Sequence, residues 1–426
     1  MAGKRNKQLS AAAAVTGKPS SQRRADSPLQ GVKVLEVAQY IAGPFAGQQL
    51  ADLGAEVIKI ERPGHGDPFR TYVGGRDIVN FGYHYRAYNR NKKSIVLDLQ
   101  HPAARDIFRR LAAKADVVLE NFRPGVMDRL GIGYEWLREF NPGLVFCSVT
   151  GFSGDGPYRD RPAFDTVGQA LSGILYSFTD PERPSLRGPT LVDQATALQA
   201  SNAIIAALYA RNASGVGARI DISMVDASVG FIPDFHASYT DAGLAMEPDT
   251  RAAVSHAFIM RCSDGLIAFQ LGGIERAWIG LCKAIDGPEI ARDPRFSERA
   301  ARLAHWAELI DLIRPIFLTQ TRSYWEKRLG GEDIPCAAVL SIPEVHNDPE
   351  IQHSGLFEQI EHSVAGPMTM MRRVPRINQS RGPAQSPPAL LGEHTDGVMR
   401  DLGYNEAEVA VFRSAGVIGI LETPRK

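Results

Sequence analysis

The sequence predicts an α/β protein with a Rossmann-like large domain and a smaller α+β domain. Short apolar segments alternate with helical periodicity through the first half of the chain, which is typical of a parallel sheet flanked by helices. Residues 31–67 contain a strand, a helix, a second strand and a glycine loop, in that order. Two strands joined by one helix imply parallel pairing with a right-handed crossover. A second region with the apolar patterns of strands and helices lies at residues 252–334, and it follows a segment in which such patterns are weak.

Each element of the large domain is expected from its local pattern. Val34, Leu35 and Val37 mark the first strand, and residues 56–61 alternate as a second strand does. Further strands are expected at residues 94–97, 117–120, 144–150 and 219–225, and helices at residues 48–52, 102–115, 192–212 and within 127–140. The small domain is expected to have a strand pair within residues 260–271 and helices at residues 278–285 and 299–318.

These patterns divide the chain into parts. Residues 28–225 form the large domain, residues 226–251 a linker, and residues 252–334 the small domain. Residues 1–27 are rich in Lys, Arg and Ser, and Asp26 is their only acid, so we expect a disordered basic tail. The alternative for this tail is an organelle transit peptide, because such peptides are also rich in Arg and Ser and poor in acids.

The composition limits the partners of the protein. The 426 residues carry 48 basic and 48 acidic side chains, and this balance gives no electrostatic footprint for nucleic acid. No apolar run approaches the roughly 18 residues that cross a bilayer, so we expect no membrane partner. The four cysteines are isolated and the histidines lack ligand spacing, so we expect no metal site. We expect a cytoplasmic location, or an organelle matrix if residues 1–27 are a transit peptide.

The glycines after the first strand point to a nucleotide, but not to NAD. Dinucleotide-binding loops have the pattern G-x-G-x-x-G, whereas residues 43–47 here have the pattern G-P-x-x-G. Pro44 also lacks the N–H that a pyrophosphate would accept. We therefore expect Gly43, Pro44 and Gly47 to form a tight turn beside a different ligand.

Six motifs along the chain resemble the class III CoA-transferase family, which includes formyl-CoA and carnitine CoA-transferases and the related α-methylacyl-CoA racemases. The motifs are A-G-P at residues 42–44, L-G-A-x-V-I-K-I-E at 53–61, P-G-x-G-D-x-x-R at 63–70, N-x-N-K-x-S-I-x-L-D-L at 89–99, A-D-V-x-x-E-N-F-x-P-G at 115–125 and L-L-G-E-H-T-D at 390–396. The resemblance implies that the large domain binds CoA and that residues 335–426 return to it. It also implies an interlocked homodimer.

The resemblance implies covalent catalysis by Asp193. In this family an Asp carboxylate attacks an acyl-CoA, giving an aspartyl anhydride and then an aspartyl-CoA thioester, and the CoA is passed to a carboxylic acid. Asp193 begins a helical run, where the helix dipole favours the ionised carboxylate. The same position suits a structural N-cap, and the two roles are compatible. The resemblance implies no permanently bound cofactor, since the CoA thioester is a substrate.

The CoA-binding residues are also implied by the resemblance. The expected contacts are Tyr40 with pantetheine, Leu97 with adenine, Asn121 and Phe122 at a loop that meets the ligand, and Arg129, Arg62 or Arg70 with the 3′-phosphate. Each arginine could instead be an ordinary surface charge, and Phe122 could be a core residue. Ile41 stands where formyl-CoA transferase has a Gln that touches the reacting group. This difference argues against oxalate or formate, and the acids remain open.

Two alternatives to a transferase remain. An α-methylacyl-CoA racemase needs a second proton carrier, because inverting a carbon takes an acid and a base. Racemases have a His immediately before an Asp at the position where this chain has Phe164 before Asp165, and a phenyl ring cannot carry a proton. Asp165 resembles an acid that hydrogen-bonds near the transferase site, or it is a turn acid before a helix. The second alternative is a CoA-binding protein without activity.

Overall fold

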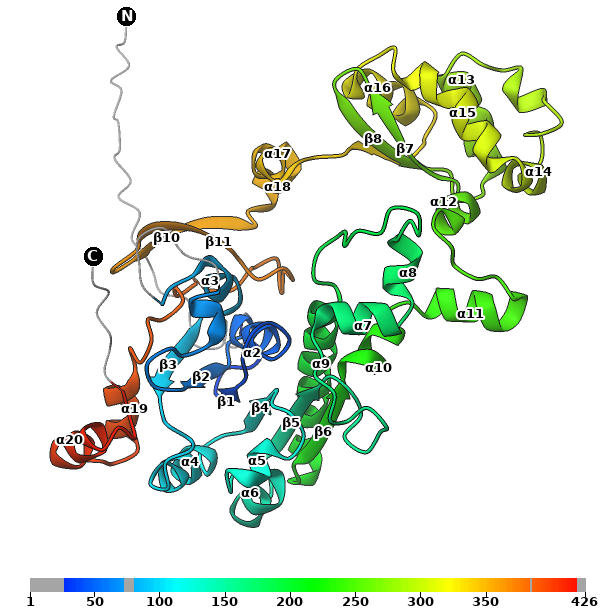
Figure 1. Ribbon diagram of the computed structural model, residues 1–426. Coiled ribbons are helices and arrows are strands. Elements are labelled where there is room, and N and C mark those ends of the chain that lie inside the picture. The colour runs from blue at the N-terminus through cyan, green and yellow to red at the C-terminus, as the bar shows by residue number, and fades with distance from the viewer. Residues whose placement is uncertain (1–26, 73–79, 384, 420–426) are drawn as a thin grey trace, which may run out of the picture. The chain divides into compact units, whose positions relative to one another are not determined.

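The computed structural model describes residues 27–72, 80–383 and 385–419 (Figure 1). The predicted basic tail, residues 1–27, lies outside the described residues except for its last residue. The chain forms two compact units. The first comprises Met1–Ser148, Ala200–Ile220 and Phe357–Lys426, and the second comprises Val149–Gln199 and Asp221–Leu356. The units differ from the predicted domains chiefly at residues 149–199, which belong to the second unit.

The main sheet has six strands in the order β3-β2-β1-β4-β5-β6. Its strands are β1 (Lys33–Val37), β2 (Glu56–Glu61), β3 (Lys92–Val96), β4 (Val117–Glu120), β5 (Val145–Thr150) and β6 (Ala218–Ser223), which confirms the predicted strands. The pairs β1–β2, β2–β3, β1–β4 and β4–β5 are parallel. The strand order reverses between β1 and β4. Ligands of doubly wound sheets bind outside the carboxyl ends of the strands at such a reversal.

Helices and a hairpin complete the first unit. They are α2 (Ala42–Asp52), a 3₁₀ turn η1 (Pro68–Arg70), α3 (Tyr83–Tyr88), α4 (Ala104–Ala112), α5 (Val126–Arg129), α6 (Tyr134–Phe140), β10 (Phe357–His362), β11 (Gly366–Met371), α19 (Thr395–Asp401) and α20 (Glu406–Ser414). Val398, Met399 and Val409 share one core with Leu35 and Val118 of the main sheet. Burial of these apolar side chains is what attaches the C-terminal helices to the sheet.

The predicted tight turn at residues 43–47 is wrong, because α2 already begins at Ala42. Pro44 fits in the first turn of a helix, where its missing N–H has no intrahelical partner in any case. The glycines serve close packing. A Cβ on Gly43 would lie 2.3 Å from the Cβ of Ala38, and a Cβ on Gly47 would lie 1.9 Å from Oε2 of Glu36.

Glu36, on β1, belongs to a buried ionic cluster beneath α2. Lys59 Nζ lies 2.9 Å from Glu36 Oε1 and 2.9 Å from Asp67 Oδ2, and Lys92 Nζ lies 2.8 Å from Glu36 Oε2. Lys59 also donates to the carbonyl of Ala38. Buried charges of this kind persist only when each has a partner. The cluster therefore holds strands β1, β2 and β3 and the loop that follows β1 in one arrangement.

The second unit begins with helices. They are α7 (Asp165–Leu171), α8 (Ile174–Phe178), the first part of α9 (Val192–Ser214), α10 (Met224–Val229), α11 (Pro233–Ala242) and α12 (Thr250–Ser255). The predicted helix at residues 192–212 is confirmed by α9. The predicted linker at residues 226–251 contains most of α10 and all of α11. No side chain of α11 or α12 is buried, which explains why their apolar pattern is weak.

The rest of the second unit is built on a small antiparallel sheet with helices beside it (Figure 1). Its elements are β7 (Ala257–Cys262), β8 (Gly265–Gln270), α13 (Glu275–Ala284), η2 (Ile290–Arg292), α14 (Arg299–Ala304), α15 (Trp306–Phe317), α16 (Arg322–Gly331), β9 (Cys336–Ala338), α17 (Ile342–Asn347) and α18 (Pro349–Ser354). We predicted that the chain returns to the large domain at residue 335. Strand β9 follows that residue and still pairs with β8 of the small sheet, so the return comes later than predicted. No helix among the described residues is long and apolar enough to cross a membrane.

Candidate functional site

Asp193 is the second residue of helix α9, so it is not the cap of that helix. The cap comes from another helix. Oδ1 of Asp165, the first residue of α7, accepts the backbone N–H of Val192 at 2.7 Å and that of Asp193 at 3.2 Å. These are two of the N–H groups that a helix start leaves without an intrahelical partner. Asp165 therefore fixes the position of the backbone that carries the Asp193 carboxyl.

Gln169 holds the other oxygen of Asp165. It lies one helical turn after Asp165, and its Nε2 donates both to Asp165 Oδ2 and to the carbonyl of Pro189. The side chain is only 2% exposed, and its Oε1 has no hydrogen-bond partner among the described residues. An unsatisfied buried acceptor costs about 1–3 kcal/mol. The amide keeps this orientation because both atoms that face Nε2 are acceptors.

Helix α7 lies close enough to α9 that one position must be glycine. A Cβ on Gly168 would lie 2.6 Å from Cγ1 of Val192. This close approach brings the first turn of α9 against α7 and buries the surroundings of Asp193. Phe164, immediately before α7, is 59% exposed and has no proton to transfer.

Burial, and then the negative charge of Asp165, raise the pKa of Asp193 from 3.8 to about 7. The sequence led us to expect a carboxylate that is fully ionised at neutral pH, because the helix dipole acts in that direction. The structure reverses the expected direction, because desolvation disfavours the charged form and a nearby like charge adds to this effect. At neutral pH Asp193 is therefore close to an equal mixture of acid and carboxylate.

In the first unit, the predicted CoA-binding residues follow the carboxyl ends of four strands. Tyr40 and Ile41 come after β1, and Arg62, Leu97 and Asn121 directly follow β2, β3 and β4. Phe122 follows Asn121, and Arg129 is the last residue of the short helix α5. Because the strands are parallel, these residues share one edge of the sheet, and those after β1 and β4 flank the reversal of strand order.

Asn121 shapes the loop after β1 through two hydrogen bonds to the backbone of Gln39. Its Oδ1 accepts the N–H of Gln39 and its Nδ2 donates to the carbonyl of Gln39, both at 2.8 Å. The next residue, Tyr40, has a φ of 65°, a left-handed conformation that is uncommon outside glycine. Its N–H donates to Asp67 Oδ1, and its ring meets Phe69 edge-on at 5.4 Å. The loop is thus held in one strained shape from both sides.

The remaining predicted contacts differ in exposure. The side chains of Ile41 and Leu97 are 5% and 1% exposed, which leaves a ligand little side-chain surface to touch. Phe122 is half-buried against the core of the first unit. Arg62 and Arg129 are exposed.

Arg70 is wrong as a phosphate contact in this structure. It is 1% exposed, and its Nε and Nη2 both donate to the carboxylate of Glu61 at 2.7 Å. Its guanidinium also lies over the ring of Tyr85 at 3.6 Å. The sequence could not distinguish it from Arg62, since both flank the same glycine loop. Gln169 was missed as part of the site, although an Asp and a Gln four residues apart on a helix are a detectable signal.

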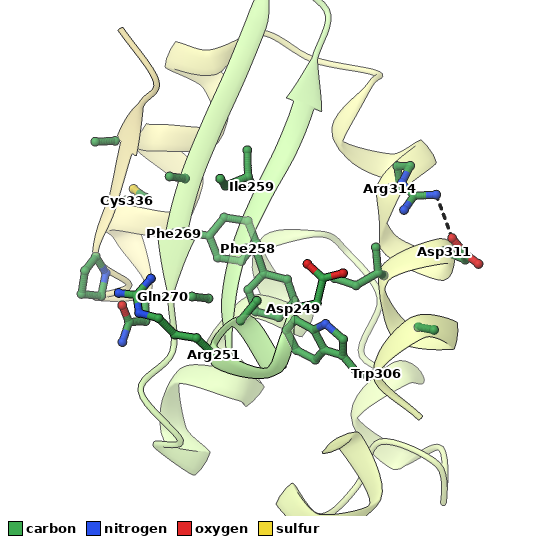
Figure 2. A pocket seen from close by; sticks show the side chains of 17 residues that line it. Asp249, Arg251, Phe258, Ile259, Phe269, Gln270, Trp306, Asp311, Arg314 and Cys336 are labelled. Carbon is green, nitrogen blue, oxygen red and sulfur yellow. Dashed lines mark hydrogen bonds and ion pairs between the residues drawn. The ribbon is translucent and has the colours of Figure 1, made fainter. Parts of the chain in front are cut away.

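A hollow in the second unit is distant in sequence from these residues. It has a volume of about 880 Å³ and lies between the small sheet and α15, with Phe258, Phe269 and Trp306 on its walls and Arg251 and Arg314 at its rim (Figure 2). None of the predicted site residues lines it. Arg314 is paired with Asp311 at 2.7 Å.

Comparison with known proteins gives the family. Residues 29–395 match the model of CoA-transferase family III. The chain belongs to CoA-transferase family III. It is 33% identical to human succinyl-CoA:glutarate CoA-transferase, over 96% of this chain and 94% of that protein. It is 34% identical to succinyl-CoA–D-citramalate CoA-transferase from Chloroflexus aurantiacus, over 93% of this chain and 100% of that protein.

A solved structure supports the same assignment. A CAIB/BAIF family protein from Brucella suis superposes with a TM-score of 0.78 at 32% identity, covering 88% of this chain and 100% of that one. The family predicted from the six motifs is confirmed, and the chain is a CoA-transferase.

Proposed function

We propose that this family III enzyme moves CoA from an acyl-CoA donor to a small carboxylic acid through a covalent bond to Asp193. The observation that supports this role most directly is the environment of the Asp193 carboxyl. It is half-buried at a helix start, beside a second carboxylate, and its pKa is raised to about 7. Strongly perturbed carboxyls of this kind are typical of catalytic groups.

The proposed reaction has four steps. An oxygen of Asp193 attacks the thioester carbonyl carbon, the C–S bond breaks, and a mixed anhydride and the CoA thiolate result. The thiolate then attacks the Asp193 carbonyl carbon, which releases the donor acid and leaves an aspartyl-CoA thioester. The acceptor carboxylate attacks this thioester and expels the thiolate again. Finally the thiolate attacks the acyl carbon of the acceptor, which frees Asp193. The acyl groups stay activated throughout, so ATP and a bound cofactor are not needed.

We propose a dicarboxylic acyl-CoA such as succinyl-CoA as the donor. Two relatives that align along almost the whole chain are named for succinyl-CoA, with glutarate and D-citramalate as their acceptors. Ile41 replaces the Gln implied by the resemblance to formyl-CoA transferase, which argues against oxalate. A panel of mono- and dicarboxylic acids with succinyl-CoA or acetyl-CoA, with products identified by mass, tests the choice of acids.

Asp193→Asn is the direct test of the chemistry. An amide cannot attack the thioester, so transfer should fall by at least about a thousandfold while CoA still binds. Hydroxylamine added with acyl-CoA should convert Asp193 of the wild-type enzyme to a hydroxamate, which peptide mass spectrometry locates. Turnover of Asp193→Asn at the wild-type rate, or a hydroxamate on another carboxyl, would overturn the assignment.

The same experiments separate the alternatives. A racemase would exchange the α-hydrogen of a 2-methylacyl-CoA with deuterium from solvent, and the proposed transferase would not. Phe164 argues for the transferase, since it offers no proton where a racemase needs one. A protein that only binds CoA would bind it without forming any hydroxamate.

We further propose that the enzyme works as a homodimer, interlocked as the family resemblance implies. Several large apolar side chains of the second unit are exposed on its helices or immediately before one. They are Phe164 at 59%, Tyr176 at 53%, Phe178 at 50% and Tyr239 at 65%. Large exposed apolar side chains of this kind support the proposal that another chain covers part of this unit.

A further inference from the structure

The hydrogen bonds around Asp193 place a second carboxylate where it acts directly on the nucleophile. Oδ1 of Asp165 accepts the N–H of Asp193 itself, together with that of Val192. Asp165 is 7% exposed, so water does little to screen its charge. The two carboxyls therefore share one partly dry site at the start of α9.

Asp165 cannot turn away from this arrangement. Its Oδ1 is held by two backbone N–H groups of α9, and its Oδ2 is held by Nε2 of Gln169. Gln169 is fixed in turn by the carbonyl of Pro189, in the segment that leads into α9. Rotation of the Asp165 side chain would break two or more hydrogen bonds in a buried place, so the repulsion between the carboxylates is not relieved by local movement.

We propose that Asp165, held by Gln169, is a positioning residue that favours the acylated form of Asp193 over its free carboxylate. The inference rests on the function proposed above, in which Asp193 is the nucleophile. A free Asp193 carboxylate is negative and faces a second negative charge. In the anhydride and in the aspartyl-CoA thioester Asp193 is neutral, because the negative charge has left with the thiolate or with the released acid. Acylation therefore removes the repulsion, and this shifts the equilibrium toward the covalent intermediates.

The helices α8 and α10, which contact α7, bring no charge that competes with Asp165. Helix α8 contains no titratable side chain other than Tyr176, which pairs with Glu247. Helix α10 carries one acid, Asp226, which is exposed and accepts from Ser153. Among the described residues, Asp165 is the one charge that shifts the pKa of Asp193. Asp226 therefore offers a matched control, being an aspartate on a helix that contacts α7.

The test compares pH profiles. Asp165→Asn keeps the size of the side chain and an oxygen that can accept the two N–H groups, and it removes the charge. The acidic limb of kcat/KM should have its midpoint near pH 7 in the wild-type enzyme, as the pKa of Asp193 requires. In Asp165→Asn this midpoint should move about 1 pH unit lower, and the fraction of enzyme trapped as hydroxamate at steady state should fall about tenfold. Asp226→Asn should change neither quantity.

Each outcome decides a separate point. If hydroxylamine labels Asp193, but the midpoint of the acidic limb is the same in folded Asp165→Asn as in the wild-type enzyme, this inference is overturned and the proposed function stands. Absence of label in the wild-type enzyme overturns the proposed function itself. Asp165→Ser, also neutral and able to cap a helix, replaces Asp165→Asn if circular dichroism shows that the latter does not fold. A wild-type midpoint near pH 4 would overturn the inference without any variant.

Discussion

The raised pKa of Asp193 couples activity to stability at the scale of single residues. The folded chain binds the proton of this carboxyl more tightly than the unfolded chain does, since its pKa is about 7 when folded against 3.8 for an unperturbed carboxyl. The contribution of this carboxyl to the free energy of unfolding is fully present below about pH 4 and is lost as the pH rises through about 7. By the usual factor of 1.4 kcal/mol per pH unit, the charged carboxylate costs up to about 4 kcal/mol above pH 7.

Asp193→Asn, which we expect to be inactive, should therefore be more stable than the wild-type enzyme. The gain should be near zero at about pH 4 and should grow toward about 4 kcal/mol at about pH 8, because only the wild-type side chain ionises in that interval. Thermal unfolding of both proteins across this pH range measures the difference. A gain that does not change with pH would mean that the effect comes from packing and not from the charge.

The residues of the site were predictable only in part. Asp193 and Asp165 were singled out by the resemblance to the family, and both lie at helix starts as expected. The direction of the pKa shift was not predictable, because it depends on how closely α7 approaches α9. That approach depends on Gly168, which nothing in the local sequence distinguishes from an ordinary helical glycine.

At the scale of secondary-structure elements, the A-G-P motif and Gly47 matter for packing rather than for a turn. A Cβ on Gly47 would lie 1.9 Å from Oε2 of Glu36, a side chain that Lys59 and Lys92 hold in place. Gly47→Ala should therefore lower the free energy of unfolding by about 1–3 kcal/mol or more, since the Glu36 carboxylate has nowhere to move. Denaturant unfolding monitored by circular dichroism measures this loss.

Gly397→Ala is the matched control for this prediction. Gly397 also lies inside a helix of the first unit, α19, and no atom lies within 4 Å of the place of its Cβ. Alanine there should be neutral or stabilise the helix by about 0.5–1 kcal/mol. Equal losses in both variants would contradict a specific clash at Glu36.

Most elements with a buried face were predictable, and exposed helices were not. Five of the six strands of the main sheet are mostly buried, β6 is not, and all six were predicted. Helix α11 has no buried side chain, so its sequence carries no apolar period and was taken for a linker. The β10–β11 hairpin was not predicted either, although Met368 and Met370 of β11 are buried.

At the scale of the whole molecule, the way the chain alternates between its two units bears on how two copies would assemble. The chain passes between its two units four times, at residues 148/149, 199/200, 220/221 and 356/357. Helices α11 and α12 bury no side chain, and large aromatic residues such as Tyr239 stand exposed in the same unit. A unit with these features is expected to complete its apolar contacts with a second chain.

If the two chains are interlocked as proposed, they can exchange partners only by unfolding. A tagged and an untagged preparation, mixed at native conditions, should form no mixed dimers over days. They should form them after denaturation and joint refolding, because only unfolded chains can thread through each other. Affinity capture of the tag followed by mass analysis detects the mixed species.

Dilution to nanomolar concentration should likewise yield no folded monomer, since dissociation and unfolding are then a single step. Mixed dimers that form quickly under native conditions would show that the two chains are in contact but not interlocked.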